Sequence, residues 1–278
     1  MIERVVEWVR THNPRPVMAV VVLLRTVLEW LIPGRRRRAV EAMRLFRPEA
    51  DARTLRRLAW RHLRFANFRS EVRYRPGDLV RQRVEGLEHL HAAQADGTAT
   101  ILTFLHHGYY AGAYASLANA GVPQTIVVSD ESMAERPPLW LRHHIKMAGS
   151  GPGITFVGVG IGFRGMVAVL ESGATLTMAC DVPGRHRVEF LGRSWSGTTS
   201  IAGLAVRTGA RIVPVTSEQR DGTPVVVVNP ALDPADFPDA DALTTALLAT
   251  LAPSALAWPD GYDVPLQMWQ PWPGADRA

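Results

Sequence analysis

Helical spacing of apolar residues dominates the first quarter of the chain. After Asp51, which is suited to cap a helix, buried-type positions recur three and four residues apart. These positions are Leu55, Leu58, Ala59, His62 and Leu63. Pro48 separates this helix from an earlier one, and the Pro-Gly-Asp triplet at residues 76–78 ends the pattern. We therefore predict that residues 1–75 form a helical N-terminal element.

Short, continuously apolar runs alternate with helical segments from residue 76 onward. The predicted strands are 83–85, 98–105, 124–128, 153–157, 174–180, 211–215 and 224–229. The predicted helices are 86–94, 108–120, 133–147, 164–171, 196–208 and 241–251, and residues 253–278 are predicted to be irregular but ordered. Such alternation is typical of a sheet that is covered on both faces. We predict the α/β class: a mixed central sheet flanked by helices on both faces, in a domain of residues 76–278 that continues from the N-terminal element.

Residues 16–33 are the most apolar run of the N-terminal element. The run contains Arg25 and Glu29, and it is shorter than the roughly 20 apolar residues that span a bilayer. The GRRRR run at residues 34–38 follows where a signal peptide would have small residues for cleavage. An apolar helix followed by arginines is typical of a segment that lies in the membrane interface, with the arginines on lipid phosphates. An ordinary buried helix followed by solvated charges is the alternative.

The net charge of +5 is unevenly distributed along the chain. The first 75 residues carry 18 arginines and 7 acidic residues, whereas acidic residues exceed basic ones in the remainder. A basic segment of this kind suggests an anionic partner, either lipid headgroups or nucleic acid. Because the arginines flank an apolar helix and no groove-reading or stacking motif appears, we expect an anionic membrane surface and no nucleic acid.

Cys180 is the one cysteine of the chain, which excludes an internal disulfide and a cysteine-rich metal site. It lies in an apolar run that is predicted as a strand. We therefore expect a small buried residue here, and we assign it no role as a nucleophile or metal ligand.

The most informative chemistry follows the predicted strand at residues 98–105. His106 and His107 come directly after this strand and open a helix of small residues. Ligands bind at such strand ends, and N–H groups at the start of a helix stabilise an oxyanion or a phosphate. A histidine here is able to deprotonate an attacking hydroxyl near neutral pH, and Gly108 lets a substrate approach the backbone. We rank His106 ahead of His107 as the catalytic base, with packing or capping as the alternative role.

The stretch from His106 to Ala111 resembles the His-x4-Asp/Glu motif of a large group of acyltransferases. Residues 84–90 are similar to the lead-in to that motif, and Asp181 follows an apolar strand as in the group's acidic strand-end motif. The most specific match is Phe190-Leu191-Gly192, Thr198-Thr199 and the LAVRTGARIVP run at residues 204–214. On these motifs, residues 35–229 resemble the lysophospholipid acyltransferase superfamily, and within it the lipid A late acyltransferases and the mycobacterial phosphatidylinositol mannoside acyltransferase.

The resemblance implies acyl transfer from a thioester, acyl-CoA or acyl-acyl carrier protein, to a hydroxyl or amine of a lipid or glycolipid. It also implies no metal and no cofactor, and a peripheral or monotopic protein on the cytoplasmic face of the cell membrane. A pathway-specific acceptor held on a carrier protein stays open as an alternative to a membrane lipid.

Ala111 departs from the family pattern, because the family has an acid there that orients the histidine. In one outcome another carboxylate replaces it; the candidates are Asp130, Glu131 and Asp181. In a second outcome, a tyrosine hydroxyl or His107 orients His106. In a third, catalysis is lost and the chain only binds lipid or a carrier.

Substrate contacts follow from the same chemistry. Gly108 is a candidate together with Tyr109 and Tyr110, which replace the polar–aromatic pair of the family. Thioester donors carry phosphates, which arginines bind well; the candidates after Asp181 are Arg185, Arg187 and Arg193, with solvated loop charges as the alternative. Thr198 and Thr199 precede a predicted helix, where they hold the acceptor or cap the helix.

Overall fold

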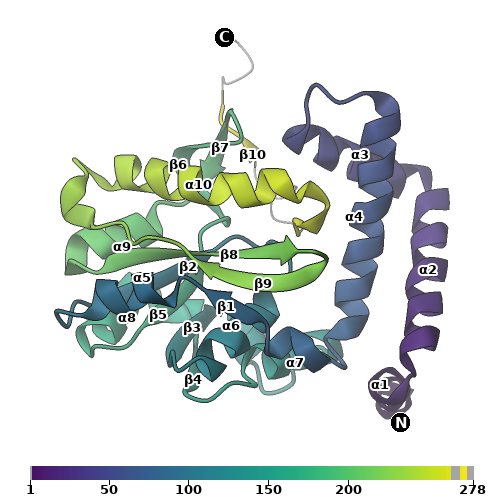
Figure 1. Cartoon of the computed structure of the whole chain (residues 1–278), viewed down its shortest axis with the longest axis horizontal. Helices are drawn as coiled ribbons and strands as arrows, with labels where there is room; N and C mark the ends of the chain where they lie inside the picture. Colours follow the sequence, from purple (N-terminus) through teal and green to yellow (C-terminus); the bar gives the residue numbers. More distant parts are fainter. Residues whose placement is uncertain (1, 264–269, 274–278) are drawn as a thin grey trace.

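A mixed seven-stranded sheet forms the centre of the computed structural model, which describes residues 2–263 and 270–273 (Figure 1). The strand order is β1-β9-β8-β2-β5-β3-β4, and neighbours are parallel except for β8 and β9. The strands are β1 (Arg83–Glu85), β2 (Thr100–Phe104), β3 (Gln124–Val128), β4 (Ile154–Gly158), β5 (Leu176–Ala179), β8 (Arg211–Arg220) and β9 (Thr223–Val228). The structure thus confirms the predicted α/β class and mixed sheet.

Helices cover both faces of this sheet. On one face lie α8 (Gly162–Glu171), α9 (Ser200–Thr208) and α10 (Ala240–Ala257), while α3 (Pro33–Phe46) and α4 (Ala52–Val72) stand beyond one end of the sheet and join the same core. On the other lie α5 (Leu87–Gln94), α6 (Tyr110–Asn119) and α7 (Leu139–Ala148). The central strand β2 is buried at every position. Its successive residues Ile101 and Leu102 belong to the cores on opposite faces of the sheet. This double burial explains why β2 is a continuous apolar run in the sequence.

The N-terminal element packs into the α/β part instead of standing apart from it. Helix α4 begins at the predicted cap, where the Asp51 carboxylate accepts a hydrogen bond from the Thr54 N–H at 2.6 Å. Met43 and Phe46 of α3 and Leu55 of α4 join the same hydrophobic core as α9 and α10. Helices α3 and α4 and the α/β part of the chain therefore share one core.

Helices α1 (Ile2–His12) and α2 (Arg15–Leu31) differ from α3 and α4, because their apolar faces point outward. Helix α2 packs on α4 through polar contacts: Arg25 pairs with Glu71, and the Asn67 amide donates to Glu29 at 3.3 Å. The outward stripe of α2 consists of Val17, Val20, Leu23, Leu24, Val27, Leu28 and Leu31, which are 38–66% exposed. This inverted polarity leaves a long apolar surface uncovered.

One described helix, α10, is by itself long and apolar enough to cross a membrane. It is a core helix, since Leu243, Leu247 and Leu251 are buried against the sheet and α9. Helices α2 and α3 pass the same test only as a joined pair, and a 97° bend separates them.

The segment after Asp181, expected to be a loop, is a β-hairpin. Strands β6 (Pro183–Phe190) and β7 (Arg193–Gly197) pair antiparallel, and β10 (Gln270–Pro271) adds to β7. Leu191 and Gly192 form the turn with φ of 55° and 70°, as a two-residue hairpin turn requires. The charged side chains of this segment concealed the alternation, because Val188, Phe190, Trp195 and Gly197 are its only buried residues.

Several helix boundaries also differ from prediction. Helix α9 begins at Ser200 and not at Ser196, because residues 193–197 form β7. Helix α7 begins at Leu139 and not at Met133, because the residue before a proline avoids helical backbone and Pro137-Pro138 precede the helix. Helix α10 continues past Leu251 through Pro253 to Ala257, where burial of Ser254 and Ala255 supports its last turn. The predicted irregular end therefore starts later; residues 264–269 and 274–278 lie outside the described part.

Candidate active site

His106 lies at the carboxyl end of β2, next to the carboxyl end of β5. These two strands are parallel neighbours in register from Ile101 with Leu176 to Phe104 with Ala179. The chain leaves β2 at His106 and leaves β5 at Asp181, so the sheet brings the two side chains together although 75 residues separate them. The ligand-binding edge of a parallel sheet is therefore where the predicted base meets one of its predicted acids.

Asp181 makes two hydrogen bonds with His106 and a third with a tyrosine. Its Oδ1 accepts from His106 Nδ1 at 2.7 Å, and its Oδ2 accepts from the His106 backbone N–H at 2.7 Å. The Tyr262 hydroxyl also donates to Oδ2, at 2.7 Å. Because Asp181 is fully buried and held from three directions, its position relative to the imidazole is fixed.

Burial and Asp181 act in opposite directions on the pKa of His106. Burial is the largest influence and favours the neutral ring, whereas the charge of Asp181 and its hydrogen bond favour the imidazolium. The two effects of Asp181 together prevail, and the pKa of His106 is raised above its ordinary value. In the neutral ring Nδ1 carries the proton that Asp181 accepts, which leaves the lone pair on Nε2. That tautomer is the one a general base needs.

The His106 ring, which is 26% exposed, lines a cavity of about 510 Å³. The walls of this cavity are mainly apolar and aromatic: Phe104, Tyr114, Ile126, Leu141, Ala148 and Phe156. Polar side chains near His106 are few, and they include Arg73, His144 and Asp263. A cavity of this size and lining is typical of a site for an apolar small ligand with a few orienting polar groups.

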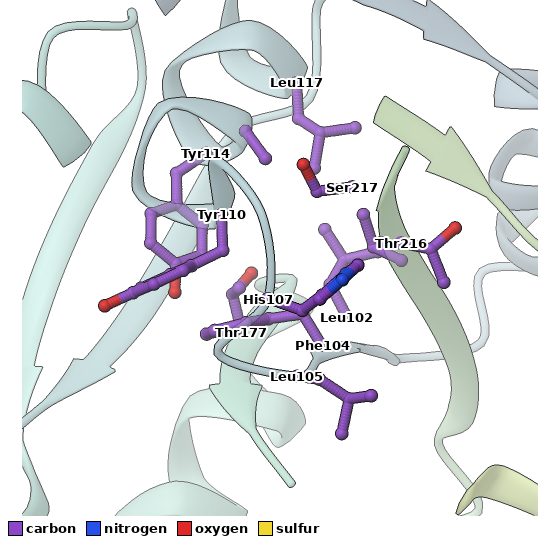
Figure 2. Close-up of a pocket in the computed structure, with 12 residues that line it drawn as sticks. Leu102, Phe104, Leu105, His107, Tyr110, Tyr114, Leu117, Thr177, Thr216 and Ser217 are labelled. Carbon is purple, nitrogen blue, oxygen red and sulfur yellow. The ribbon is translucent and has the colours of Figure 1, made fainter. Parts of the chain in front are cut away.

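His107 lies in the interior, on the other side of the turn. It is 3% exposed, and its Nε2 donates to the Trp258 carbonyl at 2.8 Å. Figure 2 shows it beside Leu102, Thr216 and Ser217, around a cavity of about 10 Å³ that is at the lower limit for a single water. Burial lowers the pKa of His107 to about 4, so the ring is neutral at physiological pH. The structure gives this residue the packing role that was the alternative in the sequence.

Asp130 and Glu131 are exposed at the carboxyl end of β3. The Asp130 carboxylate accepts the Gly160 N–H at 2.9 Å, which ties the ends of β3 and β4 together. Of the three carboxylates predicted as substitutes for the acid missing at Ala111, Asp181 is the one that contacts His106.

Residues 57–269 match the sequence model of a family described as bacterial lipid A biosynthesis acyltransferase. The chain belongs to this family. It is therefore an acyltransferase of lipid biosynthesis, as the sequence motifs implied. It is also similar to the crystal structure of the 1-acyl-sn-glycerophosphate acyltransferase PlsC from Thermotoga maritima, at 14% identity and a TM-score of 0.42, over 84% of this chain and 94% of that one. Curated protein sequences gave no match.

The first residues after the histidines hold the turn of this acyltransferase in place. Gly108 has a φ of 61°, and a Cβ there would meet Ser217 and Trp258. The Gly108 N–H donates to the Gly261 carbonyl at 2.8 Å, and the Tyr109 N–H donates to the Ser217 hydroxyl at 3.0 Å. The expected oxyanion role of N–H groups in this turn therefore does not extend to these two, because both already have partners.

Tyr109 and Tyr110 point to different surroundings. The Tyr109 ring packs edge-on against Phe65 at a centroid distance of 5.1 Å. The Tyr110 ring lies 4.9 Å from the His106 ring and lines the 510 Å³ cavity. Of the two predicted substrate contacts, Tyr110 is the one placed beside the predicted base.

The predicted substrate arginines lie on the β6–β7 hairpin and are exposed: Arg185, Arg187 and Arg193. Arg187 pairs with Glu189 of the same strand at 3.0 Å. Thr198 caps the start of α9, since its hydroxyl accepts the Ser200 N–H at 3.1 Å. Thr199 directly precedes this helix. These five residues are not among those that line the 510 Å³ cavity.

Several side chains at the site were not predicted from the sequence. Tyr262 lies in a segment expected to be irregular, and Asp263 follows it. Arg69 and Arg73 were counted within the basic charge of the N-terminal element, although their i,i+4 spacing at the end of α4 was a usable signal. His144 on α7 also lines the cavity, and burial lowers its pKa to about 3.

In the described residues, no group of three or more His, Cys, Asp or Glu side chains is placed to hold a metal ion. Cys180 is buried, and its thiol donates to the Phe104 carbonyl at 3.4 Å. Burial raises the pKa of this thiol above its ordinary value, which favours the unreactive neutral form.

Proposed function

We propose that this acyltransferase moves a fatty acyl group from acyl-CoA or acyl-acyl carrier protein to a hydroxyl or amine of a lipid or glycolipid, with His106 as the general base. The proposal depends on one observation: the His106–Asp181 pair lies on the wall of an apolar cavity of about 510 Å³. Asp181 supplies the orienting carboxylate that the sequence lacks at Ala111. This contact favours catalysis over a homologue that only binds lipid.

In the proposed reaction, His106 Nε2 accepts the proton of the acceptor hydroxyl or amine while the acceptor oxygen or nitrogen attacks the thioester carbon. The tetrahedral intermediate then collapses, its carbon–sulfur bond breaks, and the leaving sulfur takes the proton from the imidazolium. Asp181 keeps Nδ1 protonated and stabilises the imidazolium between these steps. The products are an ester or amide and a free thiol, so the steps balance without a redox cofactor.

The cavity is suited to hold the acyl chain of the donor. Its apolar wall runs from Phe104, beside His106, to Ala148 and Ile126 between α7 and the sheet. Burying each methylene of a chain in such a cavity contributes about 0.8 kcal/mol, so a long chain supplies much of the binding energy. In this proposal, the carbonyl end of the chain lies near the imidazole.

The outward stripe of α2 supports attachment to a membrane surface. Leu24 and Leu28 are 57% and 62% exposed, and Trp8 on α1 is 62% exposed. The arginines at residues 35–38 are also exposed at the start of α3, close in sequence to the end of the stripe. Apolar side chains beside arginines suit the interface of a bilayer that contains anionic lipid.

The reaction is tested with purified full-length protein and acyl-CoA donors of increasing chain length. Ala148 is 2% exposed and lines the cavity, so Ala148→Phe fills part of the space. We expect wild type to consume long-chain thioesters and Ala148→Phe to prefer shorter chains. Ala134→Phe is the matched control, since Ala134 is exposed and is not among the lining residues. An unchanged chain-length profile in Ala148→Phe would contradict the assignment of the cavity.

Membrane attachment is tested by flotation with vesicles that contain anionic phospholipid. We expect Leu24→Glu/Leu28→Glu to float at least several-fold less than wild type. Val206→Glu is the matched control, because Val206 is 52% exposed but lies on α9, away from α2. Equal flotation of the double variant and wild type would show that the stripe of α2 does not attach the protein to the membrane.

A further inference from the structure

Two arginines at the end of α4 lie near the cavity that His106 lines: Arg69 in the helix and Arg73 at its C-cap. Arg69 and Arg73 are one helical turn apart, and both line a second, smaller cavity of about 30 Å³. The first turn of α6 lines the same cavity through Tyr110, Ala111 and Gly112. Arg73, Tyr110, His144 and Asp263 line this cavity and also the 510 Å³ cavity, so the two spaces adjoin.

Arg69 carries hydrogen-bonding capacity that the described structure does not use. Its side chain is 12% exposed, and its Nη2 pairs with Asp263 at 2.7 Å. Its Nε and Nη1 are buried and have no hydrogen-bond partner among residues 2–263 and 270–273. A buried guanidinium with two unmet donors is costly, and a native structure retains one where water, an ion or a ligand completes it.

The surroundings of Arg69 favour an oxyanion. Arg73 adds a second guanidinium, and burial lowers its pKa, the direction expected when a cation is held out of water. The start of α6 contributes the positive end of a helix dipole. The acidic groups facing the site are Asp263 and Asp181, and Asp181 is already engaged by His106 and Tyr262.

We propose that Arg69 and Arg73 bind an anionic group, a phosphate ester or a carboxylate, of the acyl acceptor. The small cavity has room for water but not for a phosphate. The anion therefore lies where the small cavity meets the main cavity, beside Arg73 and Asp263. The guanidinium fork matches both anions, and the ion pair with Asp263 already shows that Arg69 binds a carboxylate.

The position relative to His106 assigns the anion to the acceptor and not to the donor. In acyl-CoA or an acyl carrier protein, a long arm with two amide groups separates the phosphate from the thioester. With the thioester carbonyl at His106, that phosphate lies far from the cluster at Arg73, which lines the cavity together with His106. An acceptor whose anion lies a few bonds from its reacting hydroxyl or amine meets both sites at once. This assignment rests on the proposed function, whereas anion binding itself does not.

Binding is measured directly by titrating full-length protein with glycerol 1-phosphate, inorganic phosphate and acetate, using glycerol as the uncharged control and tryptophan fluorescence as the signal. We expect glycerol 1-phosphate to bind, glycerol not to bind, and Arg69→Gln to weaken the binding about tenfold or more. Arg64→Gln is the matched control, because Arg64 lies exposed on the same helix. Tighter binding of acetate than of both phosphates would identify a carboxylate as the preferred anion.

Asp263→Asn gives a test of opposite sign. Removing the carboxylate that occupies Arg69 Nη2 is expected to tighten anion binding several-fold, and Arg69→Lys, which keeps the charge, is expected to restore part of the affinity. Circular dichroism melts verify that each variant is folded. Wild-type affinity in folded Arg69→Gln, or no anion binding by wild type, would overturn the proposal. Anion binding that depends on Arg69 in a protein without acyl transfer would instead sustain this site and refute the proposed function.

Discussion

The two sides of one turn hold neighbouring histidines in opposite chemical environments. His106 faces the 510 Å³ cavity, and a carboxylate raises its pKa above the ordinary value. His107 is enclosed among Leu102, Trp258 and Ser217, and burial lowers its pKa to about 4. Burial lowers the pKa of both rings, and the contact with Asp181 raises that of His106 enough to reverse the shift.

The largest expected effect separates the two imidazoles by activity. His106→Gln removes the proposed base, and acyl transfer is expected to fall by roughly 10²–10⁴-fold. His107→Gln is expected to keep the rate within a few-fold and to lower the free energy of unfolding by about 1–3 kcal/mol, because a buried hydrogen bond is disturbed. Initial rates and denaturant unfolding of both variants check this contrast, and equal rates for His106→Gln and wild type would end the catalytic assignment.

Asp181→Asn tests the partner that distinguishes His106. Loss of the carboxylate is expected to lower the rate about 100-fold, since the tautomer is no longer enforced. The base works when neutral, so wild-type activity rises with pH through the raised pKa of His106; in Asp181→Asn this rise is expected at lower pH. Asp130→Asn and Glu131→Gln are the controls, and a rate loss in them equal to that of Asp181→Asn would contradict the assignment.

Acid stability tests the environment of His107. Its pKa is about 4 in the folded chain and near 6.5 unfolded, so the unfolded state binds the proton first as the pH falls. We expect this residue to account for about 2 kcal/mol of the stability lost between pH 7 and pH 5, a loss that His107→Gln lacks. Urea unfolding at the two pH values measures it. The contribution of His106 to stability changes with pH in the opposite direction, because its pKa is raised in the folded chain. This contribution is fully present below the pKa of the unfolded chain and is lost as the pH rises through the pKa of the folded chain.

Tyr262→Phe gives the smallest expected effect. It removes the hydroxyl that donates to Asp181 Oδ2 at 2.7 Å while keeping the ring that packs on Phe46. We expect a rate reduction of up to about tenfold, which corresponds to one hydrogen bond. Tyr74→Phe is the control, because that hydroxyl bonds Arg10 outside the cavity. A larger rate reduction in Tyr74→Phe than in Tyr262→Phe would show that the Tyr262 hydroxyl does not contribute to acyl transfer.

Local patterns predicted much of the fold. Strand β3 appears at the predicted residues 124–128, and α4 begins after the predicted cap Asp51. The hairpin β6–β7 was missed because its buried residues, Val188 and Trp195, stand among charged ones. The side chains of Arg69 and Tyr262 were missed for another reason: nothing near them in the sequence shows that Arg69 meets Asp263 or that Tyr262 meets Asp181.

Local sequence patterns are enough to establish that a histidine pair follows a buried strand, that an acid follows another, and that the first helices are basic and apolar. These are local features, set by periodicity and by single residues at strand ends. Which histidine meets Asp181 and which is buried depends on the three-dimensional fold, because β2 and β5 become neighbours across 75 residues of chain. Strand pairing sets such distant contacts, and no local spacing encodes them.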